Sequence, residues 1–193
     1  MSHEQAQLTI DVHTHYFPQP FLDLIAKHGA AHGFDYKMVE GKGPQFKRGY
    51  MTTGPVSRKF IDLDMRLAAM DAQGVTAHAL SLSQPMVYWA KGDLAQHVVE
   101  TYNDALAEAH ERHPKRLFGL ASLPMHQPQL AVHEVGRAAK LPGVRGFYVA
   151  TNIEGKDLSD PSFFPVYEIV ESTGLPIFLH PLEVIGHERL APH

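Results

Sequence analysis

The sequence of 193 residues contains no cysteine, so it offers neither disulfides nor thiolate ligands for a metal. It has no apolar run of about 18 residues, the length that a membrane-spanning helix needs. Its first residues, MSHEQAQ, lack the apolar core of a signal peptide. Basic residues form no excess, because the formal net charge is −4. We therefore expect a cytoplasmic protein with neither nucleic acid nor a membrane as a partner.

Histidine, in contrast, is abundant, with 14 copies in the chain. Because cysteine is absent, a metal site would have to consist of imidazole and carboxylate ligands, which suit zinc or a similar divalent ion. Hydrophobic residues make up 44% of the sequence and charged residues 20%. This composition is typical of a globular protein, and the length is enough for one sizeable domain.

Short apolar segments alternate with helical patterns along the chain. Strands are expected at residues 8–15, 75–82, 116–124, 144–151 and 175–181, each followed by a helix or a loop and a helix. Strands that are apolar on both faces and alternate with helices predict an α/β fold with a parallel sheet. A doubly wound open sheet and a (β/α)8 barrel both fit this order. No GxGxxG motif follows any expected strand, so nothing indicates a nucleotide site.

Residues 30–57 interrupt this alternation. The segment is rich in glycine, proline, lysine and threonine and shows little periodicity. Loops of this length are usually functional or disordered. We therefore expect an irregular insertion between the first two strands of the parallel sheet.

Three histidines close apolar strands. The first expected strand ends in DVHTH, and strand alternation would place Asp11, His13 and His15 on one face, with the imidazoles about 7 Å apart along the strand. His180 ends the fifth expected strand. The carboxyl ends of parallel strands lie on one side of the sheet, where active sites are found. The pattern favours a metal site over a chance pair, although a single His-x-His is also expected by chance at this histidine content.

Several longer stretches indicate a family. The segments DVHTHYFP, YWAK and LPMHQPQLAV make the chain resemble the amidohydrolase superfamily of metal-dependent (β/α)8 TIM barrels. Within it, the chain is similar to the amidohydrolase-2 branch, which includes 2-amino-3-carboxymuconate-6-semialdehyde decarboxylase and related carboxy-lyases. The resemblance implies that residues 1–193 are the N-terminal part of one barrel domain, with an insertion at about 30–57. About the first five β/α units would be present, since a complete barrel needs about 250 residues.

The resemblance also implies a ligand set. One divalent ion, usually zinc, would be held by His13, His15 and His180. The fourth expected strand ends in VATN, without the lysine that bridges two metals in binuclear relatives, which favours a single ion. The further aspartate ligand and the catalytic histidine of the family would lie beyond residue 193, so no catalytic residue is assigned. An arginine of the insertion would hold a substrate carboxylate, and here Arg48 is chosen, with Lys47 as the alternative.

These features predict a metal-dependent nonoxidative decarboxylase that acts on a small unsaturated or aromatic carboxylic acid. A metal-dependent hydrolase of the same superfamily and a non-catalytic metal-binding fragment are the alternatives. Leu182 stands where the muconate-semialdehyde decarboxylase has an aromatic residue, so that substrate is not assigned. The resemblance is compatible with a homodimer, because related decarboxylases are often dimers, but the sequence itself fixes no oligomeric state.

Overall fold

A parallel sheet forms the centre of the molecule. The computed structural model describes residues 8–49 and 51–182. The sheet has five strands in the order β1-β5-β6-β7-β10, and every neighbouring pair is parallel. These strands are β1 (Ile10–His15), β5 (Ala77–Ser81), β6 (Leu117–Ser122), β7 (Val144–Ala150) and β10 (Ile177–His180). The strand order follows the chain without the reversal of a doubly wound sheet, which identifies a parallel half-barrel sheet.

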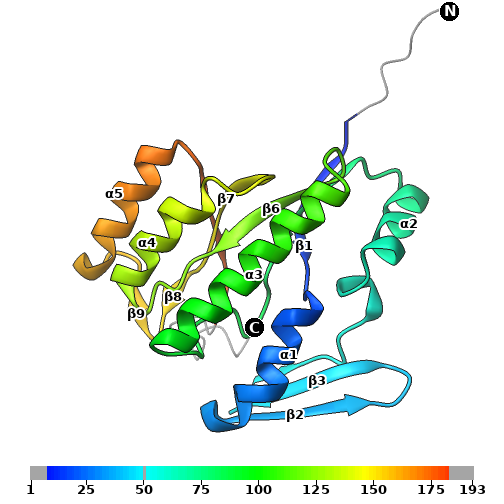
Figure 1. Ribbon diagram of the computed structural model, residues 1–193, viewed down its shortest axis with the longest axis horizontal. Helices are drawn as coiled ribbons and strands as arrows, with labels where there is room; N and C mark the ends of the chain where they lie inside the picture. The colour runs from blue at the N-terminus through cyan, green and yellow to red at the C-terminus, as the bar shows by residue number, and fades with distance from the viewer. Residues whose placement is uncertain (1–7, 50, 183–193) are drawn as a thin grey trace, which may run out of the picture.

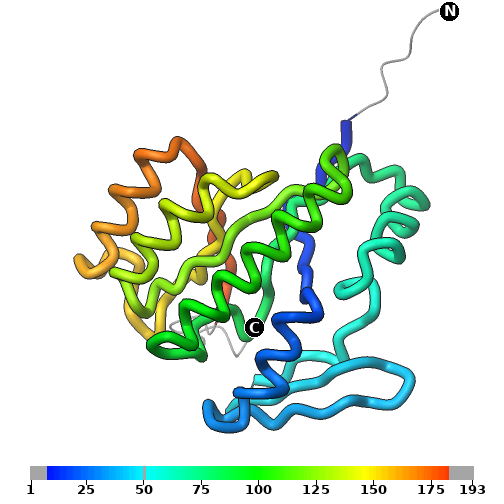
Figure 2. The backbone as a smooth tube through the Cα atoms, viewed as in Figure 1, coloured from blue at the N-terminus to red at the C-terminus, as the bar shows by residue number. Residues whose placement is uncertain are grey.

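Helices cover the outer side of this sheet. They are α1 (Gln19–His28), α2 (Leu63–Gln73), α3 (Asp93–Arg112), α4 (Pro128–Ala138) and α5 (Phe164–Thr173). Helices α3, α4 and α5 form a row across one face, and α2 stands apart at the β1 end of the sheet (Figures 1 and 2). None of the described helices is both long and apolar enough to span a membrane.

Local signals set the ends of α2 and α3. The Asp62 side chain caps α2 by accepting hydrogen bonds from the backbone N–H groups of Asp64 and Met65, at 3.0 and 3.1 Å. The helix stops at Gly74, whose φ of +68° is left-handed and suits glycine. Helix α3 begins at Asp93, and Gly92 occupies its N-cap position.

The insertion is folded, which corrects the expectation of an irregular segment. A 3₁₀ turn, η1 (Gly29–His32), leads into an antiparallel sheet of β2 (Phe34–Val39), β3 (Gly43–Arg48) and β4 (Met51–Thr53). The β2–β3 hairpin lies next to α1, on the side toward which β1 runs (Figure 1). Phe34 and Phe46 are buried, and their rings are 6.1 Å apart. The insertion therefore packs on the side of the parallel sheet where the strands end.

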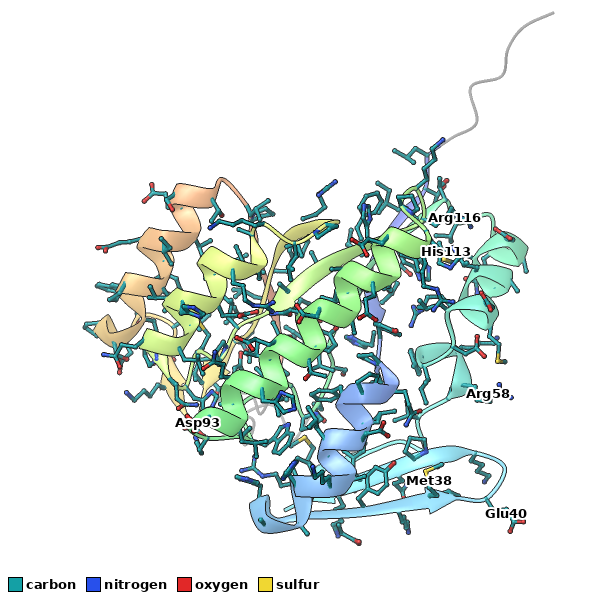
Figure 3. The ribbon with its side chains drawn as sticks, viewed as in Figure 1. Met38, Glu40, Arg58, Asp93, His113 and Arg116 are labelled. Atoms are coloured by element: carbon teal, nitrogen blue, oxygen red, sulfur yellow. The ribbon has the colours of Figure 1, made fainter. Side chains whose placement is uncertain are left out.

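The remaining elements are short. They comprise the 3₁₀ turns η2 (Arg58–Phe60) and η3 (Pro161–Phe163) and the antiparallel pair β8 (Asn152–Ile153) and β9 (Lys156–Asp157). Asp160 caps η3 through a 2.9 Å bond from the Ser162 N–H, as its position before a proline predicts. The charged side chains labelled in Figure 3, such as Glu40 and Arg58, lie on the outside of the molecule.

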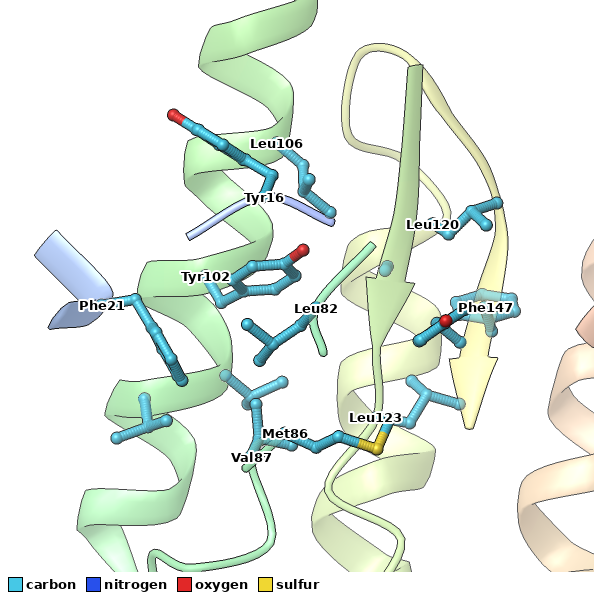
Figure 4. Close-up of a cluster of buried hydrophobic side chains, with 14 of the residues drawn as sticks. Tyr16, Phe21, Leu82, Met86, Val87, Tyr102, Leu106, Leu120, Leu123 and Phe147 are labelled. Atoms are coloured by element: carbon cyan, nitrogen blue, oxygen red, sulfur yellow. The ribbon is translucent and has the colours of Figure 1, made fainter. Parts of the chain in front are cut away.

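The apolar core lies between the parallel sheet and helices α1 and α3. Figure 4 shows Tyr102 of α3 packed near Tyr16 and Leu82, which follow the ends of β1 and β5. Phe21 of α1 packs against Tyr102, with ring centroids 5.8 Å apart. Each fully buried side chain of this size stabilises the fold by about 1.5–3 kcal/mol. This packing holds the carboxyl ends of β1 and β5 in place, where the candidate site is built.

Both outermost strands of the parallel sheet leave apolar side chains exposed. Within the described part of the chain, β1 pairs only with β5 and β10 pairs only with β7. Leu8, Ile10 and Val12 on the β1 side are exposed by 67, 49 and 51%, and Leu179 of β10 by 56%. Apolar strand edges of this kind are normally covered in a closed barrel.

Candidate metal centre

The structure brings three histidines of β1 and β10 together. The ring centroids of His13 and His15 are 5.0 Å apart, and those of His13 and His15 lie 5.4 and 5.2 Å from His180. One ring nitrogen of each lies within 4.8 Å of the others. Nitrogen ligands of a tetrahedral zinc ion are about 3.4 Å apart. The three imidazoles are thus near the separation that a shared divalent ion requires.

A β-bulge in β1 makes this convergence possible and corrects one expectation. The register with β5 slips between Asp11 and Thr14, so that Asp11 pairs with His78 whereas His15 pairs with Ser81. Asp11 therefore does not share the face of His15. Its Oδ1 atom instead accepts a 2.9 Å bond from the backbone N–H of His13 within the bulge. A bulge re-aims side chains in this way, frequently next to functional sites.

The ring of His15 is held from behind by a serine. Its Nδ1 atom lies 3.2 Å from the Oγ atom of Ser81, which also donates to the carbonyl of Thr14 at 3.2 Å. Tyr148 of β7 lies near the same serine. Its ring is 5.4 Å from that of His180 and 6.4 Å from that of His15. Neither Ser81 nor Tyr148 was predicted from the sequence to have a role at this site.

A buried arginine holds the backbone of His15. Arg66 of α2 is only 4% exposed, and its guanidinium donates to the carbonyl of His15. It also lies 3.2 Å from the Nδ1 atom of buried His78 and over the ring of Tyr16. Because arginine stays protonated, His78 accepts this bond through an unprotonated Nδ1. Helix α2 thus fixes the end of β1 through a side chain whose role the sequence did not reveal.

The three imidazoles have the chemistry of metal ligands. Burial, followed by the neighbouring His180 and His13, lowers the pKa of His15 from 6.5 to about 4. Burial and the proximity of His13 also lower the pKa of His180. Metals bind the neutral imidazole. At neutral pH both rings are therefore in the form that binds a divalent ion, and the residues present fit such a group.

Two spaces adjoin His15. A cavity of about 320 Å³ is lined mainly by residues of β1, β4 and the segment after β4, including Phe17, Thr53, Val56 and Phe60. A larger space of about 750 Å³ lies between β1 and α2 and is lined by both His13 and Arg66. The insertion therefore forms one wall of the smaller cavity, which is mostly apolar and next to the imidazoles.

Arg48 lies away from the imidazoles. Its Nε atom donates to the carbonyl of His32 at 3.2 Å, and its guanidinium is 5.7 Å from the ring of Phe34. It lines neither of the two spaces next to His15. The exposed side chain of Lys47 points to the opposite face of β3. The substrate-binding role of Arg48 stays a prediction.

A second group of potential ligands occurs on the outer helices. Glu100, His133 and Glu134 offer atoms within 4.8 Å of one another. Glu134 is 1% exposed, but Arg137 already binds it with two 2.8 Å hydrogen bonds and Asn103 with a third of 2.6 Å. These contacts account for the buried carboxylate, so we assign this group to the packing of α3 against α4.

The fold and the imidazoles together define a parallel α/β half barrel with a candidate site for one divalent ion. A family model described as Amidohydrolase matches residues 10–192. The chain therefore belongs to the amidohydrolase family, as the sequence resemblance indicated.

Curated relatives and solved structures that match most of this chain are named as decarboxylases. The 2-amino-3-carboxymuconate-6-semialdehyde decarboxylase of Dictyostelium discoideum is 33% identical over 95% of this chain and 51% of its own length. A solved 2,6-dihydroxybenzoate decarboxylase in complex with 2,6-dihydroxybenzoate is 26% identical, with a TM-score of 0.69 over 96% of this chain and 54% of that one. The dihydroxybenzoic acid decarboxylase of Polaromonas sp. JS666, with bound manganese and the inhibitor 2-nitroresorcinol, is 24% identical, with a TM-score of 0.67 over 96% and 52%.

The chain spans about half the length of the curated relatives that it matches.

Proposed function

We propose that this chain is the N-terminal part of a metal-dependent nonoxidative decarboxylase of a small unsaturated or aromatic carboxylic acid. The observation that supports this proposal is the convergence of His13, His15 and His180 at the carboxyl ends of parallel strands. One ring nitrogen of each lies within 4.8 Å of the others. Active sites of parallel barrels lie at this end. In this proposal residues 1–193 belong to a single barrel domain, and the barrel is completed by strands that this chain does not contain.

In the proposed reaction, the bond between the substrate and its carboxylate carbon breaks and carbon dioxide leaves. The electron pair stays on the substrate carbon, which then takes up a proton. A divalent ion supplies positive charge that stabilises this electron density. His13, His15 and His180 would hold the ion, and the wall that contains Phe17 and Val56 would exclude water from the ring of the substrate. The family resemblance assigns proton transfer to a histidine beyond residue 193.

Two finer assignments belong to this proposal. We propose zinc as the ion, because three imidazoles suit it, although manganese accepts histidine and carboxylate ligands as well. We also retain Arg48 as the group that binds the substrate carboxylate, because a guanidinium grips a carboxylate by two parallel hydrogen bonds. In the structure only its Nε atom has a hydrogen-bond partner among the described residues, so its terminal amino groups are free to bind a ligand.

A decarboxylase is favoured over a hydrolase by the names of the relatives, which include two kinds of decarboxylase at 30% identity or more. A small-molecule carboxylic acid is accordingly the proposed partner. A homodimer and a cytoplasmic location stay predictions that rest on the family resemblance and on the composition.

Metal analysis and an activity assay test the proposal. The protein, in the longest form that its gene encodes, is loaded with zinc or manganese and incubated with carboxyphenols and carboxymuconates. We expect about one ion per chain and release of carbon dioxide from at least one substrate, with both lost in His13→Ala and His180→Ala. Release of an amine or alcohol without carbon dioxide would favour the hydrolase. Absence of stoichiometric metal would overturn the proposed site.

A further inference from the structure

The ring of His15 contacts the hydroxyl of Ser81 on β5, and the ring of Tyr148 on β7 lies beside it. We propose that Ser81 and Tyr148 are positioning residues that keep the proton of His15 on Nδ1 and thereby direct its Nε2 atom to the metal. This inference rests on the proposed function, because it assumes that a metal binds the three imidazoles. It concerns side chains for which neither the sequence nor the family resemblance assigned a role.

The bonding of Ser81 determines which nitrogen of His15 carries the proton. A serine hydroxyl has one proton to donate and two lone pairs that accept. The Ser81 proton is directed to the carbonyl of Thr14, 3.2 Å from Oγ. In the proposed arrangement Oγ accepts from His15, whose Nδ1 atom is 3.2 Å away. The hydrogen bond at one imidazole nitrogen sets the tautomer and leaves the other nitrogen for a metal.

Tyr148 completes this arrangement. Its side chain lies near Ser81, and a phenol that donates to the serine would use the second lone pair of Oγ. Ser81 is fully buried, so water does not compete for these bonds. The ring of Tyr148 also packs against that of His180, at a centroid separation of 5.4 Å. The ring of one tyrosine thus lies next to two of the three proposed ligands.

The sheet register places these groups on one face. Ser81 is in register with His15 across β5 and β1, and residues in register on parallel strands point to the same side. Ala150 is in register with His180 across β7 and β10, and Tyr148 precedes Ala150 by two residues. All of the interacting side chains therefore point into the half barrel.

Metal titration of the chain tests the proposal without any assay of activity. Zinc and cobalt(II) are titrated into wild type, Ser81→Ala and Tyr148→Phe, and binding is followed by calorimetry and by the visible spectrum of cobalt. Loss of groups that orient a ligand typically weakens metal binding about 10- to 100-fold. We expect a loss in this range for Ser81→Ala, a smaller one for Tyr148→Phe and a changed cobalt spectrum in both.

Matched controls are available on the same scaffold. Ser122 ends β6 as Ser81 ends β5, and it is equally buried, but its hydroxyl has no partner among the described residues. Tyr167 of α5 donates to the carbonyl of Leu158 at 2.7 Å, away from the imidazoles. Ser122→Ala and Tyr167→Phe should bind metal as wild type does. Equal weakening by Ser122→Ala and Ser81→Ala, or wild-type binding by Ser81→Ala, would overturn the proposal.

The tautomer itself is measured by ¹⁵N NMR of the imidazoles in the metal-free protein, with His15 assigned by comparison with His15→Gln. We expect the proton on Nδ1 in wild type and a population on Nε2 in Ser81→Ala. A wild-type His15 with its proton on Nε2 would overturn the inference even if Ser81→Ala fails to fold. Failure of wild type to bind either ion would contradict the proposed function instead, and the tautomer would still test the positioning role.

Discussion

At the scale of single residues, His15 is held at two points, by Ser81 at its ring and by Arg66 at its backbone carbonyl. The ends of the first and fifth apolar segments marked His13, His15 and His180, because strand position can be inferred from local sequence. Arg66 and Ser81 reach His15 from elements that are distant in the chain. Such contacts depend on helix packing and strand register, which local patterns do not encode. The same limit explains the error at Asp11, since no local signal announced the bulge in β1.

The lowered pKa of His15 predicts how acid acts on the metal-free protein. The pKa of His15 is about 4 in the folded protein, whereas 6.5 is its ordinary value and applies to the unfolded chain. Between pH 4 and pH 6.5 the unfolded chain therefore binds more protons than the folded protein. The free energy of unfolding should therefore fall as the pH drops from 6.5 toward 4. Urea unfolding in EDTA at pH 7 and pH 5 measures this difference.

A His15→Gln variant serves as the reference for this measurement. It should lose less stability than wild type between pH 7 and pH 5, because its side chain does not titrate. The remaining dependence would come from His78, His126 and His180, whose pKa values are also lowered, in each case mainly by burial. An identical pH dependence in the two proteins would show that His15 is not the buried, neutral group described above.

At the scale of elements, periodicity predicted the parallel strands and their helices but failed in the insertion. The signal was present in FDYKMV, where Phe34, Tyr36 and Met38 alternate with two charged residues and a valine. It is followed by the turn-forming EGKG. The strands were overlooked because glycine, proline, lysine and threonine recur through residues 30–57 and obscure this short alternation. In the structure, the hairpin packs through the buried side chains of Phe34 and Phe46.

A buried polar network joins α3, α4 and β6, and it predicts a large effect of one substitution. The Asn103 side chain bonds to both the carbonyl and the N–H of Ser122 and to the carboxylate of Glu134. Asn103→Ala would leave all three buried groups short of a partner. We expect the free energy of unfolding to fall by about 2–4 kcal/mol in urea denaturation.

The control for this network lies on the same helix. Gln96 donates to Glu100 at 2.9 Å on the exposed face of α3, where water can replace the bond. Gln96→Ala should change stability by no more than about 0.5 kcal/mol. Similar values for Gln96→Ala and Asn103→Ala would mean that the buried network does not join these elements as the structure indicates.

At the scale of the whole molecule, the sheet order settles what the sequence left open between a doubly wound sheet and a barrel. Both arrangements share the same local β-α pattern, and only the pairing of the strands separates them. Among the described residues, β1 and β10 each have one unpaired side. In the proposed barrel, further strands would cover Ile10 and Leu179, which are exposed in the described chain.

Because Ile10 is exposed on β1, we expect Ile10→Lys to have different effects in the 193-residue chain and in a longer protein that closes the barrel. In the 193-residue chain, Ile10→Lys replaces an apolar side chain that is 49% exposed, so it should reduce self-association in light scattering with little change in melting temperature. In a longer protein that closes the barrel, the same lysine would be placed between strands without a partner and should lower the melting temperature by several degrees. Ala72→Lys, on the exposed face of α2, adds the same single positive charge and is the control in both. An unchanged melting temperature for Ile10→Lys in the longer protein would mean that no strand covers β1, and the proposed barrel would then be wrong.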